Sequence, residues 1–340
     1  MNSKGLVKVE MQERSDLVNG CKIWPIGSGK GGVGKSFITA NLGLALAEIL
    51  SKGEERVVLF DADLGGGNLH TCFGMKNPPF TVQDFISKRK ENLSQIMLET
   101  PLPNLKLISG TSGVLSVANP RYGDKMRLLN HFNDLEADYL LLDLSAGSSY
   151  NTIDFLSLSS EAIVITTPEP AALLASYGFI RNALYRKLMR FLHKQPLILP
   201  LIVEAMNRNG RWKVGICGQL IEAIGKVDQE VARQTLDFVI NFKVYLILNM
   251  VRNRRDINVG EKFRLVTKKY LHCDLCYLGH VVWDERVRKA ARRMSPLVFE
   301  YPHSTASRCI YLLAQKLLTE GQQGANRKLF QACLEMASEG

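Results

Sequence analysis

The stretch that decides the fold is Ile26–Ser36, IGSGKGGVGKS, which contains five glycines and two lysines. Its last eight residues fit the pattern G-x-x-x-x-G-K-S/T, in which glycines let backbone N–H groups turn inward around phosphate oxygens. An apolar segment, CKIWPIG (21–27), precedes the pattern, and helically spaced apolar residues follow it over 35–53. A strand, a glycine loop and a helix N-terminus in this order predict a nucleotide-phosphate site.

The polar residues of this loop carry the chemistry. Lys35 is expected to reach the β- and γ-phosphates of a nucleotide, and the Ser36 hydroxyl is expected to bind Mg²⁺. The nucleotide-binding residues that we predict from the loop are Gly29, Gly31, Gly32, Val33, Gly34, Lys35, Ser36 and Phe37.

Five further apolar runs end in polar or glycine residues, as buried strands of a parallel sheet do. These runs are RVVLFDAD (56–63), LKLISG (105–110), DYLLLDLSAG (138–147), EAIVITTPEP (161–170) and VYLILNM (244–250). Helical patterns lie between several of them, so the sequence predicts an α/β fold with a doubly wound, mostly parallel sheet flanked by helices. Ligands of such sheets bind at the carboxyl ends of the strands, and we expect the chemistry there.

The alternation of strands and helices breaks between Arg181 and Lys243. FIRNALYRKLMRFLHK (179–194) and LIEAIGKVDQEVARQTLDFVINF (220–242) each have the apolar spacing of an amphipathic helix. We interpret residues 190–240 as a helical insertion and not as a separate domain.

The length, composition and charge of the chain limit the kinds of protein that it can be. The chain has 340 residues, of which 46% are hydrophobic, and its net charge of +10 favours anionic partners such as nucleic acid or acidic lipid. No apolar run is long enough to span a bilayer, and the N-terminus lacks the apolar core of a signal peptide. Seven scattered cysteines, an odd number, fit a reduced protein. We expect a cytoplasmic protein, with peripheral binding to the inner face of the cell membrane as a further option.

Lys30, five residues before Lys35, distinguishes this loop from an ordinary phosphate loop. The form KGGVGKS resembles the deviant Walker A motif of the MinD/ParA family of P-loop ATPases. The resemblance implies that ATP and Mg²⁺ are the cofactors, and that ATP is hydrolysed by an ATP-dependent homodimer. In this family the extra lysine reaches the partner's nucleotide, so the charge of Lys30 would stabilise the γ-phosphate only in the dimer. The alternative is a solvated loop lysine.

The segment VVLFDADLGGGNLH (57–70) resembles switch I of the same family. By this resemblance Asp63 orients the attacking water and Asp61 supports the metal shell. A turn-capping role is the alternative for Asp63. Together with the loop, this segment predicts Lys30, Lys35 and Asp63 as catalytic residues.

The segment DYLLLDLSAG (138–147) resembles the Walker B and switch II region. The resemblance implies that Asp143 holds Mg²⁺ through water and that the Gly147 N–H senses the γ-phosphate. The predicted metal-binding residues are therefore Ser36, Asp61 and Asp143.

Two later segments resemble the base-binding side of the family. In relatives, the asparagine that ends the strand within YLILNMVRN (245–253) reads the adenine edge, which makes Asn249 the candidate, with a strand-end turn as its alternative. YLGHVVWDERVRKAARRMSPLVFEYPHSTASR (277–308) resembles the closing strand and the last helices, and Asp284 begins the loop near the base. The resemblance covers a P-loop ATPase domain over 21–320. Residues 1–20 are polar and are interpreted as an N-terminal tail, and 321–340 as a C-terminal tail that forms either a short amphipathic helix or a core-docking or frayed segment.

Within the family, TTPEP, NMV and VRKAARRMSPLVFEYPHS look most like the flagellar-number regulators FlhG/FleN (YlxH). The first functional hypothesis is therefore a spatial regulator of flagella or another polar structure, with an FlhF-like GTPase or polar factor as partner. The second is a ParA-like chromosome or plasmid partitioning ATPase that binds non-specific DNA, and acidic membrane is the competing surface. The third is a metal- or cluster-handling relative that uses Cys273 and Cys276, which lie in HCDLCYLGH (272–280).

Overall fold

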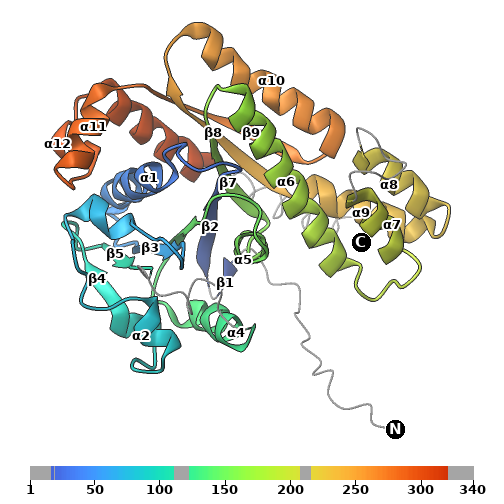
Figure 1. Ribbon diagram of the computed structural model, residues 1–340, viewed down its shortest axis with the longest axis horizontal. Coiled ribbons are helices and arrows are strands. Elements are labelled where there is room, and N and C mark those ends of the chain that lie inside the picture. The colour runs from blue at the N-terminus through green and yellow to red at the C-terminus, as the bar shows by residue number, and fades with distance from the viewer. Residues whose placement is uncertain (1–16, 19, 111–121, 207–215, 321–340) are drawn as a thin grey trace, which may run out of the picture.

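The computed structural model describes residues 17–18, 20–110, 122–206 and 216–320. In these residues one mixed sheet of nine strands forms the centre of the molecule (Figure 1). The strands are β1 (Leu17–Val18), β2 (Cys21–Gly27), β3 (Val57–Ala62), β4 (Met97–Glu99), β5 (Leu105–Ile108), β6 (Tyr139–Leu144), β7 (Glu161–Thr166), β8 (Lys243–Val251) and β9 (Asp274–Val282).

The strand order is β4-β5-β3-β6-β2-β7-β8-β9, and every pairing from β5 to β9 is parallel. Two short strands are antiparallel: β4 extends the sheet beside β5, and β1 pairs with the start of β2. The predicted doubly wound, mostly parallel sheet is thus confirmed. Leu17 and Val18 add a strand within the predicted N-terminal tail.

Helices cover both faces of the sheet. Those described are α1 (Lys35–Leu50), α2 (Val82–Ile86), α4 (Tyr122–His131), α5 (Tyr150–Leu156), α6 (Pro170–Phe191), α7 (Leu199–Met206), α8 (Ile216–Gly225), α9 (Gln229–Asn241), α10 (Arg254–Leu271), α11 (Glu285–Arg292), α12 (Leu297–Glu300) and a final helix whose described part covers 305–320. One apolar core joins α1, α11, α12 and the helix over 305–320 to the sheet, and the core of the opposite face joins α4–α10. The central strands β2, β3, β6, β7 and β8 are buried on both sides, which explains their continuous apolar runs.

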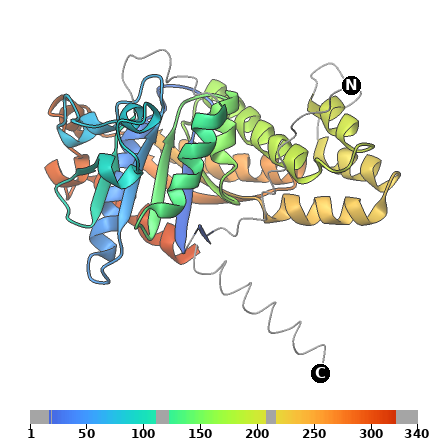
Figure 2. The ribbon, with the colours of Figure 1, turned by 90° about the horizontal axis from the view of Figure 1, so that it is seen from below.

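The segment interpreted as an insertion forms α7, α8 and α9, which gather at the end of the molecule far from α1 and α12 (Figures 1 and 2). The prediction of one helix over 220–242 is wrong, because the chain turns after Gly225 and α9 starts anew. Asp228 ends the turn as the N-cap of α9, and its side chain accepts a hydrogen bond from the Val231 N–H.

A buried ion cluster attaches α6 to the body of the molecule. Asp154 of α5 is 4% exposed, and its carboxylate pairs with Lys125 of α4 and with Arg186 and Arg190 of α6. The sequence gives no local sign of this cluster, because its four residues come from three separate helices.

Asp154→Asn is expected to lower the free energy of unfolding by about 3 kcal/mol, because it removes the buried carboxylate that three cations share. Urea unfolding of the nucleotide-free protein measures this change. Asp237→Asn on α9 is the matched control, since Asp237 is an exposed residue that pairs with Arg233 at 3.8 Å, and no measurable loss is expected there. Equal losses in the two variants would contradict a special role for Asp154.

Candidate nucleotide site

The glycine loop lies between β2 and α1, at the carboxyl edge of the sheet. Gly34 is the N-cap of α1 and has φ = 85°, a left-handed conformation that favours glycine. Gly29 packs against α6 so closely that a Cβ atom would lie 2.2 Å from the backbone of Ala175. The loop therefore depends on glycine both for its turn and for its contact with α6.

Lys35 and Asp143 are brought together as the predicted site requires. The Lys35 ammonium lies 2.7 Å from the Asp143 carboxylate, and both side chains are largely buried. Thr39, one turn along α1 from Lys35, also donates to Asp143 at 3.0 Å. We did not predict Thr39 from the sequence, although its position four residues after Lys35 places it on the same side of the helix.

Asp61 lies directly opposite Asp143, because the two residues are partners in the β3–β6 pairing. It is fully buried, and its carboxylate accepts hydrogen bonds from the N–H groups of Asp63 and Leu69, each at 3.1 Å. Burial, followed by the charge of Asp143, raises the pKa of Asp61 to about 7. Two buried carboxylates facing one lysine form a donor set suited to a divalent cation.

The glycines after Asp63 determine how closely the chain approaches Asp61. A Cβ atom on Gly67 would lie 2.5 Å from an Asp61 carboxylate oxygen, whereas one on the neighbouring Gly66 would have no other atom within 4 Å. Of these two glycines, only Gly67 brings the backbone of the segment that resembles switch I into tight contact with Asp61.

Gly67→Ala is expected to lower the free energy of unfolding by about 2 kcal/mol, because Asp61 is fixed by two hydrogen bonds and cannot move aside without losing them. Gly66→Ala provides the matched control and is expected to change stability by less than about 0.5 kcal/mol. Urea unfolding of both variants measures the difference. A Gly67→Ala protein as stable as Gly66→Ala would show that the loop shifts freely.

The switch II segment is fixed to the glycine loop through the backbone. The Gly147 N–H donates to the Ser28 carbonyl at 2.9 Å, and Gly147 has φ = 83°. Thr152 of α5 hydrogen-bonds with the hydroxyls of Ser145 (2.7 Å) and Ser149 (2.8 Å), which links this segment to α5. The γ-phosphate contact of Gly147 stays a prediction.

The remaining loop residues are placed as follows. Lys30 is exposed, Ser36 is half-buried and Val33 is buried. Phe37 packs partly buried against the core on the α1 side of the sheet. The exposed position of Lys30 at the carboxyl edge leaves its ammonium accessible to a second molecule.

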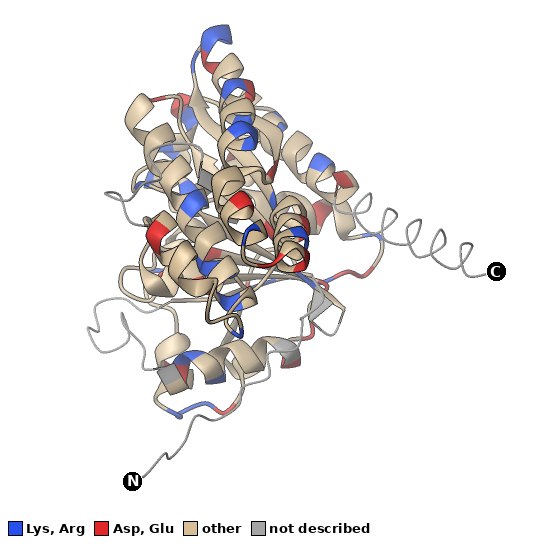
Figure 3. Ribbon diagram, turned by 90° about the vertical axis from the view of Figure 1, so that its right-hand side faces the viewer, with Lys and Arg blue, Asp and Glu red and all other residues tan. Residues whose placement is uncertain are grey.

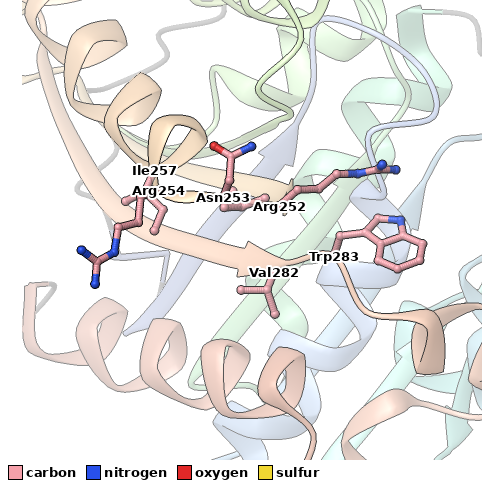
Figure 4. Close-up of a pocket in the computed structure, with 7 residues that line it drawn as sticks. Arg252, Asn253, Arg254, Ile257, Val282 and Trp283 are labelled. Carbon is pink, nitrogen blue, oxygen red and sulfur yellow. The ribbon is translucent and has the colours of Figure 1, made fainter.

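A pocket of about 430 Å³ opens beside the loop, at the carboxyl ends of β8 and β9 (Figure 4). Its lining consists of Val251, Arg252, Asn253, Arg254, Ile257, Val282 and Trp283. The Arg252 guanidinium lies 5.1 Å from the centre of the Trp283 ring, so a flat aromatic surface and a cation border the same space. We predicted this region from the sequence, but not Arg252 or Trp283 themselves.

The two predicted base-side residues flank this pocket in different ways. The Asn249 amide donates to the Val33 carbonyl at 2.8 Å, so this side chain ties β8 to the glycine loop. Asp284 caps α11 by accepting a hydrogen bond from the Arg286 N–H at 2.9 Å. A contact of either side chain with a base stays a prediction.

Cys273 and Cys276 lie at the amino end of β9, whereas the glycine loop lies at the carboxyl edge of the sheet. Cys273 belongs to the apolar core of one face, while Cys276 packs against the core of the other. Across the described residues, no group of three or more His, Cys, Asp or Glu side chains is arranged to hold a metal ion. This placement argues against the third hypothesis, a metal site at Cys273 and Cys276.

A model of the ParA family, described as NUBPL iron-transfer P-loop NTPase, matches residues 21–208, more than half of the chain. The chain belongs to the ParA family. This match includes the glycine loop and both switch segments, so the predicted resemblance is confirmed. This chain is thus a P-loop NTPase.

Among characterised relatives, the antiactivator FleN of Pseudomonas aeruginosa is 26% identical over 292 residues, which cover 85% of this ParA protein and 83% of FleN. The flagellum site-determining protein YlxH of Helicobacter pylori is 37% identical over 165 residues, which cover 47% of this chain and 53% of YlxH. The similarity to FleN thus extends over most of both chains, and that to YlxH over about half.

Solved structures share the fold. MinD of Pyrococcus horikoshii, complexed with Mg-ADP, superposes with a TM-score of 0.56 at 21% identity, over 87% of this chain and 95% of that one. A ParA family ATPase of Chlorobium tepidum gives 0.57 at 17% identity, over 87% and 98% of the two chains. No described helix of this ParA protein is long and apolar enough to cross a membrane.

Proposed function

We propose that this protein is a Mg²⁺-dependent ATPase whose ATP-bound homodimer positions a flagellum or another polar structure. The observation that carries the proposal is the buried set of Lys35, Thr39, Asp61 and Asp143 beneath the glycine loop. Mg²⁺ would be held by Ser36 and Asp143, with support from Asp61, and it would neutralise phosphate charge.

The chain's own residues divide the work of binding and hydrolysis. Lys35 would exchange Asp143 for the β- and γ-phosphates, and the loop N–H groups would surround the same oxygens. Asp63, beside the buried Asp61, would orient the attacking water. The base would bind in the pocket bordered by Arg252 and Trp283, where stacking on an aromatic ring and a cation is available.

Exposed apolar residues near the glycine loop support the homodimer. Tyr150 at the start of α5 is 77% exposed, and Leu174 in the first turns of α6 is 75% exposed. Leu174 precedes Ala175, whose backbone contacts Gly29, so it lies next to the glycine loop. Together with Lys30, these residues give the proposed dimer face an apolar surface and a cation.

The positioning role draws on the similarity to FleN and YlxH. In the host cell, replacing the natural protein with Asp63→Ala is expected to change the number or placement of flagella, because the dimer would persist after ATP binds. Normal flagella in cells with Asp63→Ala, at unchanged protein level, would contradict this role. An FlhF-like GTPase or another polar factor is the proposed partner.

A ParA-like role on DNA is the second candidate, and exposed arginines favour it. Arg254, Arg255, Arg286 and Arg288 are exposed on α10 and α11, next to the pocket. A gel shift with random duplex DNA at two salt concentrations tests this candidate, because phosphate contacts weaken steeply as salt rises. Absence of a shift at low salt would remove it.

The domain plan is also a proposal. Residues 21–320 would form one ATPase domain, with 190–240 as the helical insertion between α6 and β8. The insertion shares its apolar core with α6, since Cys217, Leu220 and Ile224 of α8 belong to that core. The predicted tail over 321–340 and its amphipathic helix lie outside the described residues.

A further inference from the structure

One flank of α6 presents a line of polar side chains toward α8 and α10. Tyr177, Arg181 and Tyr185 are spaced four residues apart, so they follow one side of the helix. α6 contacts α10, and α10 contacts α8, so this flank lies where the insertion joins the ATPase core. Figure 3 looks onto this end of the molecule, where the helices carry Lys and Arg residues interspersed with Asp and Glu.

Several hydrogen-bonding groups on this flank have no partner in the described part of the protein. The Arg181 Nε is buried and donates to no described acceptor, and the same holds for the Tyr185 hydroxyl. Tyr185 is a fully buried residue, with 0% exposure. On the facing helix, α10, the fully buried Thr267 also has an unpartnered hydroxyl.

The surroundings of Arg181 provide phenols and thiols in place of a carboxylate. Burial raises the pKa of Tyr177, the charge of Arg181 opposes this, and the other groups that act on Tyr177 are Cys273, Tyr270 and Cys217. Among the described residues, Arg181 forms no salt bridge, whereas Arg186 and Arg190 on the same helix share Asp154. The half-buried Arg181 guanidinium therefore lacks the anion that its neighbours have.

A buried N–H donor such as the Arg181 Nε is unfavourable unless an acceptor pairs with it. A guanidinium and a phenol hydroxyl together are suited to two oxygens of one oxyanion.

We propose that Arg181 and Tyr185, on the flank of α6 beside α10, bind an oxyanion of the carboxylate or phosphate class through the buried Arg181 Nε and the Tyr185 hydroxyl. This site is separate from the nucleotide site and goes beyond the proposed ATPase.

The test uses the full chain with Mg²⁺ and a saturating non-hydrolysable ATP analogue, so that the glycine loop, including its γ-phosphate position, is not available to the probe. Thermal unfolding is followed as inorganic phosphate is added, with sodium chloride at equal ionic strength as the reference. A second series uses a short peptide of glutamates, which distinguishes an acidic side chain from a free anion. Binding of the analogue is measured separately, so a failure of the ATPase proposal is recognised independently.

Arg181→Gln is expected to weaken the stabilising effect of phosphate, or of the peptide, by about tenfold or more in apparent Kd, because it removes the charge-assisted hydrogen bonds. Lys262→Gln, an exposed lysine of α10, is the matched control that removes one charge elsewhere. Tyr185→Phe, which removes only the hydroxyl, replaces Arg181→Gln if that variant fails to fold, and it is expected to weaken the effect several-fold.

A response to phosphate alone supports a free anion, and a response to the peptide alone supports an acidic side chain of a partner. The proposal is overturned if neither probe stabilises the wild-type protein beyond the sodium chloride reference. It is also overturned if Arg181→Gln, or Tyr185→Phe in its place, responds like Lys262→Gln.

Discussion

Lys35→Ala is expected to reduce ATP affinity by about 100-fold or more, because it removes the buried cation that, in the proposed function, would contact the phosphates. Lys35 is 8% exposed and lies 2.7 Å from Asp143, whereas Lys30, the other lysine of the loop, is exposed. Lys30 therefore does not occupy an equivalent place. Isothermal titration calorimetry with ATP and Mg²⁺ measures the loss.

Two controls keep this result interpretable. Lys52→Ala changes an exposed lysine just after α1 and is expected to bind ATP like the wild type. Circular dichroism establishes that Lys35→Ala is folded, since the substitution leaves Asp143 with Thr39 as its remaining side-chain donor. Unchanged ATP affinity in a folded Lys35→Ala protein would refute the assignment of the glycine loop as the nucleotide site.

Lys30→Ala and Asp63→Ala are expected to have opposite effects on association. Lys30 is exposed and contributes little to its own subunit, so Lys30→Ala should bind ATP, remain monomeric and lose turnover. Asp63→Ala should bind ATP and stay dimeric, because water is no longer oriented while the cations still hold the γ-phosphate. Sedimentation with ATP and Mg²⁺ compares both variants in one experiment.

ADP provides the internal control, since the wild type, Lys30→Ala and Asp63→Ala are all expected to sediment as monomers when ADP replaces ATP. If Lys30→Ala dimerises like the wild type, the second lysine is a solvated loop residue. If Asp63→Ala returns to monomers as fast as the wild type after ATP is consumed, Asp63 does not direct hydrolysis.

Much of the fold was predictable because its signals are local. The apolar runs that form β2, β3, β5, β6, β7 and β8 are each continuous in sequence, and strands buried on both faces need no other pattern. The glycine loop could be recognised for the same reason, since its phosphate-binding groups lie within eight consecutive residues.

The features that were missed depend on contacts between distant segments. The ion cluster of Asp154 joins three helices, and the pocket joins the ends of two strands that are about thirty residues apart in sequence. Cys273 and Cys276 look like a pair in sequence, yet the strand directs them to opposite faces of the sheet. Periodicity alone also missed the break between α8 and α9, because the apolar spacing continues across the Asp228 cap.

In the proposed function, the contact between Lys35 and Asp143 makes nucleotide binding an exchange of partners. The lysine would leave one anion for another, so the affinity for ATP would reflect the difference between the two contacts. The carboxylate released in this exchange is then available to the shell of a cation, which links the two binding equilibria thermodynamically. ATP and Mg²⁺ are therefore expected to raise each other's affinity by the same factor, and Asp143 is the residue through which this coupling acts.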